Sequence, residues 1–133
     1  MNYLLDVNVL VAWGGSDHVD HQRATTWIAA IKAANADVLQ TSAIPQLGFV
    51  RVSMQRSRGK VTASLAGRVL KGMLQKLGRQ HQFISDDQNS LLWPPWCKGA
   101  SNTTDAHLLM LAKHHEALLA TLDAGIPGAF LLP

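Results

Sequence analysis

Cysteine is almost missing from this chain of 133 residues, which contains only Cys97. A single cysteine excludes an internal disulfide and any zinc site built from several cysteines, and it is typical of a reducing compartment. No apolar run approaches the roughly 20 residues that a membrane-spanning helix requires. The N-terminal residues include no basic segment of the kind that opens a secretory signal. We therefore expect a cytoplasmic protein with no membrane-inserted part.

The length and composition predict one globular domain over residues 1–133. Apolar residues make up 47% of the sequence and charged residues 16%, a balance that excludes disordered and collagen-like proteins. A chain of this length buries roughly two-thirds of the surface that it exposes when unfolded, so it needs no disulfide to fold.

Acidic residues are missing from one long segment. Residues 51–79 contain eight lysine and arginine side chains and no acid, whereas the parts of the chain before and after them are both net negative. This pattern is typical of a surface that binds polyanions, because lysine and arginine neutralise phosphates and release counterions. The alternative is a solvated helical face without a ligand. The missing acids favour a nucleic-acid-binding segment.

Short apolar strands alternate with helical segments along the whole chain. Strands are predicted at residues 3–5, 38–39, 83–84, 118–122 and 129–132. Helices are predicted at residues 7–13, from Ser16 or Asp17 to about 35, at 43–54, at 61–77, and from a cap at Thr103 or Thr104 to about 115. Residues 86–101 are predicted to form a loop, because Pro94 and Pro95 exclude regular structure. The alternation predicts an α/β fold with a mostly parallel sheet.

Three aspartates are predicted to meet at one edge of this sheet. Asp6 and Asp123 each end a predicted strand, and Asp105 lies in the first turn of a helix whose preceding loop can reach the same edge. Ligands of open parallel sheets bind at the carboxyl ends of the strands. Converging carboxylates repel one another unless a cation lies between them, and an oxygen-only set suits Mg²⁺ or Mn²⁺. Each aspartate alone could be a helix cap or a turn residue, but their shared position favours a hydrolytic metal site.

Four segments in a fixed order resemble a known family: LLDVNVL at residues 4–10, GFVR at 48–51, TDAHLLMLA at 104–112 and LATLD at 119–123. The chain resembles PIN-domain ribonucleases of the VapC toxin type. The resemblance implies a three-layer fold, with a mostly parallel sheet of about five strands flanked by helices. It also implies an endoribonuclease that cleaves RNA with Mg²⁺ or Mn²⁺, a homodimer, and inhibition by a small VapB-like antitoxin.

The resemblance also assigns roles to single residues. Asp6, Asp105 and Asp123 match the aspartates that bind the metal and carry catalysis in the family. Asn8 matches an asparagine often found two residues after the first aspartate. The residues expected to support the metal ligands from a second layer are Asn8, Gln46 and Thr104. The cations expected to contact the RNA backbone are Arg51, Arg56, Arg58 and Lys60.

The sequence departs from the family at position 46. Many members carry a glutamate shortly before the GFVR segment, where this chain has Gln46. Glutamine offers a carbonyl oxygen but no charge, so we expect a weaker second metal site. The departure leaves open an RNA-binding module with weakened or lost catalysis. A phosphohydrolase of small substrates is a further alternative, which the basic segment disfavours because a small phosphate does not require eight cations.

Other conspicuous side chains are interpreted mainly as structural. His107 follows Asp105 by two residues and therefore points about 160° away around the helix. Trp93 and Trp96 flank the two prolines of the long loop, where they could stack on unpaired bases or pack against protein. An apolar stripe on the helix predicted at 61–77 is expected to lie in the core or an interface: Val61, Leu65, Val69, Met73 and Leu77.

Overall fold

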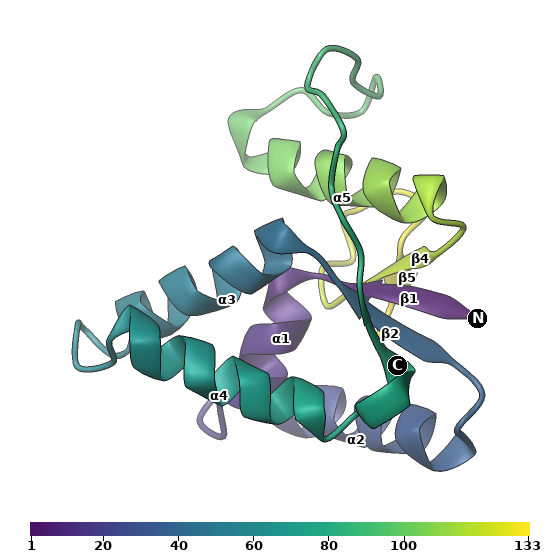
Figure 1. Ribbon diagram of the computed structural model, residues 1–133. Helices are drawn as coiled ribbons and strands as arrows, with labels where there is room; N and C mark the ends of the chain where they lie inside the picture. The colour runs from purple at the N-terminus through teal and green to yellow at the C-terminus, as the bar shows by residue number, and fades with distance from the viewer.

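A computed structural model describes all 133 residues and has a five-stranded parallel sheet at its centre (Figure 1). The strands are β1 (Asn2–Leu5), β2 (Val38–Thr41), β3 (His81–Phe83), β4 (Leu118–Thr121) and β5 (Phe130–Leu131). They lie in the order β3-β2-β1-β4-β5, and every neighbouring pair is parallel. The sheet confirms the predicted α/β fold and places β1, the first strand of the chain, in the middle.

Helices cover both faces of the sheet. The α-helices are α1 (Val7–Gly14), α2 (His21–Ala34), α3 (Ala43–Arg56), α4 (Ala63–Gln75) and α5 (Thr103–His114), with short 3-10 helices at Gly78–Gln80 and Ala100–Asn102. Helices α1 to α4 lie on one side and α5 lies on the other (Figure 1). This arrangement confirms the predicted three layers. None of the helices is both long and apolar enough to cross a membrane.

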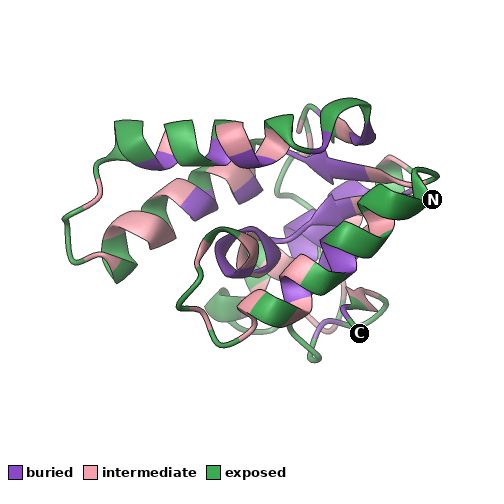
Figure 2. Cartoon of the chain, turned by 90° about the horizontal axis from the view of Figure 1, so that it is seen from below, coloured by how far each residue is buried: buried purple, intermediate pink, exposed green.

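Each face of the sheet has its own apolar cluster. Successive residues of a strand point to opposite faces, so Leu5 packs with the cluster under α1, α2 and α4, while Leu4 packs with the cluster under α5. In β4, Leu119 packs with the cluster under α5 and Ala120 packs with the cluster on the other face. In Figure 2 the strands and the inward sides of the helices are buried, and the outward sides are exposed. Both clusters hold β1 rigidly, which fixes the position of the residue that follows it.

Several element boundaries differ from the sequence prediction. The second helix begins at His21 and not at Ser16 or Asp17, because a turn bonded from His18 N–H to the Gly15 carbonyl and from His21 N–H to the His18 carbonyl occupies these residues. The third strand is His81–Phe83, since its register is set by pairing with β2, where Thr41 lies opposite Phe83.

The expected caps at Thr103 and Thr104 are absent. Helix α5 already begins at Thr103, and the hydroxyl of Thr103 donates 2.8 Å to the carbonyl of Ala100 in the preceding 3-10 turn. The 3-10 turn leads directly into α5, which begins without a side-chain cap. Asp105 is nevertheless in the first turn of α5, as predicted.

The apolar stripe on α4 is only half buried. Met73 and Leu77 lie in the core, whereas Leu65 is 40% exposed and Val69 is 44% exposed. The cause is that α3 and α4 run antiparallel and project beyond the sheet, so the N-terminal half of α4 lies outside the sheet (Figure 1). Leu65 and Val69 are therefore not in the core, and an interface position for these two residues stays a prediction.

Gly48 lies where α3 passes closest to α1. A methyl group at this position would lie 2.6 Å from Cγ2 of Val7 and 3.0 Å from its Cγ1. Because Val7 opens α1 directly after Asp6, this collision would push the two helices apart. We expect Gly48→Ala to lower the free energy of unfolding by about 1–3 kcal/mol, as measured by urea denaturation.

Gly72→Ala on α4 is the matched control for this substitution. A methyl group at Gly72 would have no other atom within 4 Å beyond its own helix turn, and alanine is the better helix former. We expect it to raise the free energy of unfolding by about 0.5–1 kcal/mol. Equal effects of the two substitutions would contradict the tight contact between Gly48 and Val7.

Candidate active site

Two strands and one helix bring the three predicted aspartates to the same edge of the sheet. Asp6 follows β1 and Asp123 follows β4, and these strands are paired so that Leu5 lies opposite Ala120. The backbone N–H of Asp6 continues the pairing with a 3.0 Å bond to the Ala120 carbonyl. Asp105 enters from the first turn of α5. Its carboxyl group is close enough to the other two for their charges to act on it.

The Asp6 carboxylate is buried and held at both oxygens. Asp6 is 4% exposed. One oxygen accepts a 2.7 Å bond from the Val7 N–H at the start of α1, and the other accepts a 2.8 Å bond from the hydroxyl of Thr121. Asp6 is thus also the N-terminal cap of α1, which was the alternative role predicted for it from the sequence. The two roles are compatible because the cap fixes the carboxylate at the sheet edge.

Thr121 belongs to the candidate site and was not predicted from the sequence. It is fully buried, and besides donating to Asp6 its hydroxyl accepts 3.1 Å bonds from the Nδ2 of Asn8 and from the N–H of Asp123. Asn8 is held from the other end as well, since its Oδ1 accepts from the Leu122 N–H at 3.1 Å. One hydroxyl therefore links the segments that carry Asp6, Asn8 and Asp123. The available signal was a polar residue ending the apolar strand two positions before Asp123.

The electrostatics of the three carboxylates are unfavourable without a cation. Burial, followed by the charges of Asp6 and Asp123, raises the pKa of Asp105 to about 6. Burial is also the main cause that raises the pKa of Asp6, with the charge of Asp123 adding to it and the bonds from Thr121 and Val7 opposing it. No lysine, arginine or histidine forms an ion pair with any of the three.

The donor chemistry of this edge fits a hard divalent cation. It offers carboxylate oxygens and no sulfur or imidazole ligand, which is the set that Mg²⁺ and Mn²⁺ favour. Ser42, which follows β2 at the same edge, is fully buried and its hydroxyl has no hydrogen-bond partner, so the edge also holds a polar group without a partner in the chain. The three carboxylates are not drawn together into a closed cluster of metal ligands.

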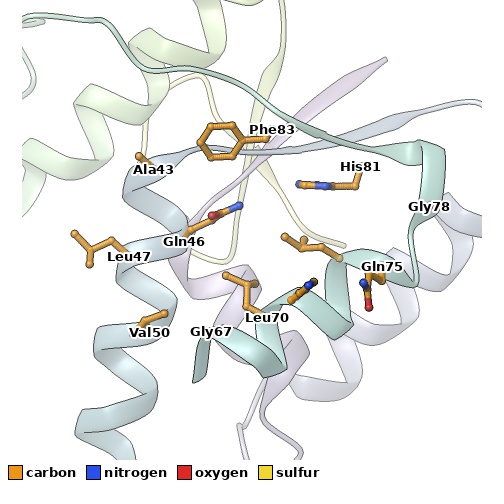
Figure 3. A pocket seen from close by; sticks show the side chains of 12 residues that line it. Ala43, Gln46, Leu47, Val50, Gly67, Leu70, Gln75, Gly78, His81 and Phe83 are labelled. Atoms are coloured by element: carbon orange, nitrogen blue, oxygen red, sulfur yellow. The ribbon is translucent and has the colours of Figure 1, made fainter. Parts of the chain in front are cut away.

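Gln46 forms no hydrogen bond with the three carboxylates. Its amide nitrogen donates 3.0 Å to the hydroxyl of Thr41, and the same hydroxyl lies 2.7 Å from Nε2 of His81. Figure 3 shows the Gln46 amide and the His81 ring pointing toward one another in the lining of one cavity. Thr104 is exposed and forms no side-chain hydrogen bond. Neither residue contacts the three aspartates through a hydrogen bond, whereas Asn8 is joined to Asp6 through Thr121.

The basic segment lies on the projecting pair of helices, α3 and α4. Arg51, Arg58 and Lys60 are exposed and have no ion-pair partner. Arg56 differs, because its guanidinium lies 3.4 Å from a carboxylate oxygen of Asp17. An acid from elsewhere in the chain thus compensates one cation that looked uncompensated in the sequence.

The remaining conspicuous residues have structural contacts. His107 points away from Asp105, as predicted, and its Nε2 lies 2.6 Å from the buried carboxylate of Asp86, tying the long loop to α5. Trp96 packs against the apolar cluster under α5. Trp93 is 38% exposed, and its indole N–H donates to the Ser90 carbonyl within the loop.

Comparison with known proteins found several similar chains of almost the same length. Ribonuclease VapC38 of Mycobacterium tuberculosis is 38% identical over 130 residues, which cover 92% of this chain and 86% of the relative. Ribonuclease VapC44 of the same species is 36% identical over 140 residues, covering 97% and 94%. Ribonuclease VapC39 is 33% identical over 132 residues, covering 95% and 91%. No protein-family model matches the sequence.

Proposed function

Since the chain belongs to the VapC family of PIN-type ribonuclease toxins, we propose that it is a divalent-metal-dependent endoribonuclease, the toxin of a VapBC-type pair. Asp6, Asp105 and Asp123 hold Mg²⁺ or Mn²⁺ and carry catalysis. The observation that supports this most directly is that three carboxylates without a cationic partner lie at the carboxyl edge of a parallel sheet, close enough for the charges of Asp6 and Asp123 to act on Asp105. A VapB-like antitoxin and a second copy of the chain are its proposed partners.

The chain's own residues hold the acidic site in place. The hydroxyl of Thr121 and the N–H of Val7 orient the Asp6 carboxylate, and Asn8 braces the turn that leads to Asp123. Asp105 is presented by the rigid first turn of α5. A divalent ion, when bound, supplies a water of lowered pKa and offsets the charge that develops on the phosphoryl oxygens. Exposed cations of the 51–79 segment bind the RNA backbone.

The direct test is cleavage of a mixed RNA pool by the purified chain. We expect cleavage with Mg²⁺ or Mn²⁺ and none with a chelator, because the carboxylates cannot stabilise the anionic transition state alone. Cleavage that persists in chelator would contradict the metal role, and salt-sensitive binding without cleavage in any metal would contradict the catalytic role.

The basic segment predicts a strong salt dependence of RNA binding. We expect the triple substitution Arg51→Gln, Arg58→Gln and Lys60→Gln to reduce the slope of log affinity against log salt by about 2, at about 0.7 per lost phosphate contact on a single strand. The measurement is fluorescence anisotropy of a labelled single-stranded RNA in chelator. The control triple Lys32→Gln, Lys98→Gln and Lys113→Gln changes the net charge equally but lies outside the segment. The same loss of slope in both triples would mean that only net charge matters.

The departure at position 46 makes its own prediction. Gln46→Glu adds a negative charge at the edge from which α3 begins, and we expect it to raise the affinity for Mn²⁺ by about tenfold. Calorimetric titration of the native chain and the variant with Mn²⁺ measures this difference. Equal affinities would mean that residue 46 plays no part in metal binding.

One observation favours a second candidate function. Residue 46 is glutamine, so the chain has no fourth carboxylate at this point, and its amide is bonded to Thr41, which also bonds to His81. An RNA-binding module with weakened catalysis would have this feature. It predicts RNA affinity equal to that of an active enzyme but little turnover, which the same cleavage experiment measures.

A further inference from the structure

A large cavity lies between α3, α4 and β3, beside the acidic edge of the sheet. Its volume is about 890 Å³, within the range of about 300–1,000 Å³ that is typical of small-molecule sites. Leu70 and Leu74 of α4 form one wall, and Leu47 and Val50 of α3 form another. Phe83 of β3 closes one side with its ring (Figure 3), and this residue is 53% exposed. The cavity thus presents an open aromatic ring over apolar walls.

Polar groups with unused hydrogen-bonding capacity point into this cavity. The carbonyl oxygen of Gln46 accepts no hydrogen bond, since only its amide nitrogen is bonded to Thr41. His81 uses Nε2 for Thr41, which leaves its Nδ1 free. Burial lowers the pKa of His81, so the ring is neutral at pH 7 and Nδ1 acts as a single donor or acceptor. The amide of Gln75 adds both kinds of group and has no partner in the chain.

The only charge in the lining of the cavity is positive. Lys71 is the only charged residue among those that line the cavity, and none of them is acidic. Lys71 belongs to the basic segment, whose exposed cations continue along α3 and α4. A ligand with an aromatic face, hydrogen-bonding edges and a neighbouring phosphate matches these features together.

The cavity reaches the same carboxyl edge of the sheet as the three carboxylates, with β2 between β3, which lines the cavity, and β1, which leads to Asp6. Thr41 ends β2, and since Leu4 pairs with Gln40, it lies beside Leu5, directly before Asp6. Gln46 is in the first turns of α3, which leaves the sheet at this edge. A strand of RNA whose phosphate lies at Asp6, Asp105 and Asp123 would therefore bring a neighbouring nucleotide to the cavity.

We propose that this cavity binds one unpaired RNA base, which stacks on Phe83 and bonds through its edge to Gln46 and His81, and so positions the strand for cleavage. The inference rests on the proposed ribonuclease function and adds a specificity site to it. Proteins recognise single-stranded RNA in this way, by splayed bases that stack on aromatic side chains and bond through their edges. Gln46 is then a base-reading residue.

The test compares RNA with a backbone that has no bases. Binding of a short single-stranded RNA, and of an abasic ribose-phosphate chain of the same length, is measured by competition in chelator for the native chain, Phe83→Ala and Phe83→Trp. We expect Phe83→Ala to weaken RNA binding about 5- to 100-fold and to leave abasic binding unchanged. Phe83→Trp keeps the stacking surface and should bind RNA as the native chain does. Leu92→Ala, a truncation of a residue that is 82% exposed on the long loop, is the control.

Each outcome decides the inference. Unchanged RNA affinity in Phe83→Ala overturns it and leaves the cavity to a protein partner such as an antitoxin segment. An equal loss of RNA and abasic binding also overturns it, because the effect would then not depend on the base. Cleavage by the native chain in Mg²⁺ is followed in parallel. If the native chain neither cleaves nor binds RNA, the proposed function itself fails, whereas cleavage combined with an unchanged Phe83→Ala overturns the base site alone.

Discussion

Asp105→Asn is expected to lower the rate of RNA cleavage at least about 100-fold while making the metal-free protein more stable. The loss of activity follows from the proposed metal role, because a bound metal contributes several kcal/mol of transition-state stabilisation and asparagine removes the charge of one of its three proposed ligands. The gain in stability follows because the carboxylate of Asp105 lies near two others without a cation. An effect on activity and stability in opposite directions is the mark of a residue placed for function.

The pH dependence of this gain has a definite sign. The pKa of Asp105 is raised to about 6 in the folded state, against about 3.9 in an unfolded chain. Well below pH 4 the group is protonated in both states, so it does not change the free energy of unfolding. Between about pH 4 and pH 6 the unfolded chain ionises the group while the folded state still holds the proton, so stability is lost over this range and the loss is complete above about pH 6. At pH 7.5 we expect Asp105→Asn to recover about 1 kcal/mol, allowing for its partial exposure to solvent.

Thermal denaturation in chelator at pH 3.5 and pH 7.5 measures this difference. Asp87→Asn, which alters an exposed acid in the long loop, is the matched control and should change neither activity nor stability. Adding Mn²⁺ should raise the melting temperature of the native chain more than that of Asp105→Asn, since the variant binds the ion less tightly. A variant that is as active as the native chain would remove Asp105 from the site.

Thr121→Val is expected to have the largest effect on stability. Valine has nearly the same shape as threonine but removes the donor to Asp6 and the acceptor for Asn8 and Asp123. Buried polar groups that lose their partners cost about 1–3 kcal/mol each, so we expect the free energy of unfolding to fall by about 3 kcal/mol in urea denaturation. We also expect the affinity for Mn²⁺ to fall about 10- to 100-fold, because the Asp6 carboxylate is no longer oriented.

Two other substitutions separate the hydroxyl from the methyl group. Thr121→Ser keeps the hydroxyl and should retain most of the metal affinity, with a smaller loss of stability from the missing methyl group. Thr26→Val changes an exposed threonine on α2 that accepts a bond from Gln22, and its effect should stay within about 0.5 kcal/mol. If Thr121→Ser lost as much metal affinity as Thr121→Val, packing and not hydrogen bonding would orient Asp6.

The sequence predicted the order and type of the strands and α-helices because apolar periodicity is a local property that the fold preserves. The prediction was wrong or incomplete where neighbours far along the chain decide the structure. Strand β3 occupies 81–83 and not 83–84 because of its pairing with β2, and the exposed part of the α4 stripe depends on how far α3 and α4 project from the sheet. Neither contact leaves a signal in the residues themselves.

The candidate site shows the same division. Asp6, Asp105 and Asp123 could be placed together because the carboxyl ends of parallel strands share one edge. The position of Thr121 between them could not be predicted, since a threonine at the end of a strand is common and its bonds to Asp6 and Asn8 join segments more than a hundred residues apart. The bond from Gln46 to Thr41 depends equally on the turn between β2 and α3, so the sequence indicated a missing carboxylate but not the cavity that the amide lines.

The pairing of β1 with β4 makes the acidic site dependent on the order in which the chain is made. The bond between Thr121 and Asp6 joins residues 115 apart, and contacts of such long range form late in folding. A nascent polypeptide that has emerged only through α4 carries the basic segment and Asp6 but neither Asp105 nor Asp123. We therefore expect the growing toxin to be harmless to the transcript and the ribosome that produce it. Translation from the N-terminus therefore delays activity, because the residues that complete the acidic site are among the last to be synthesised.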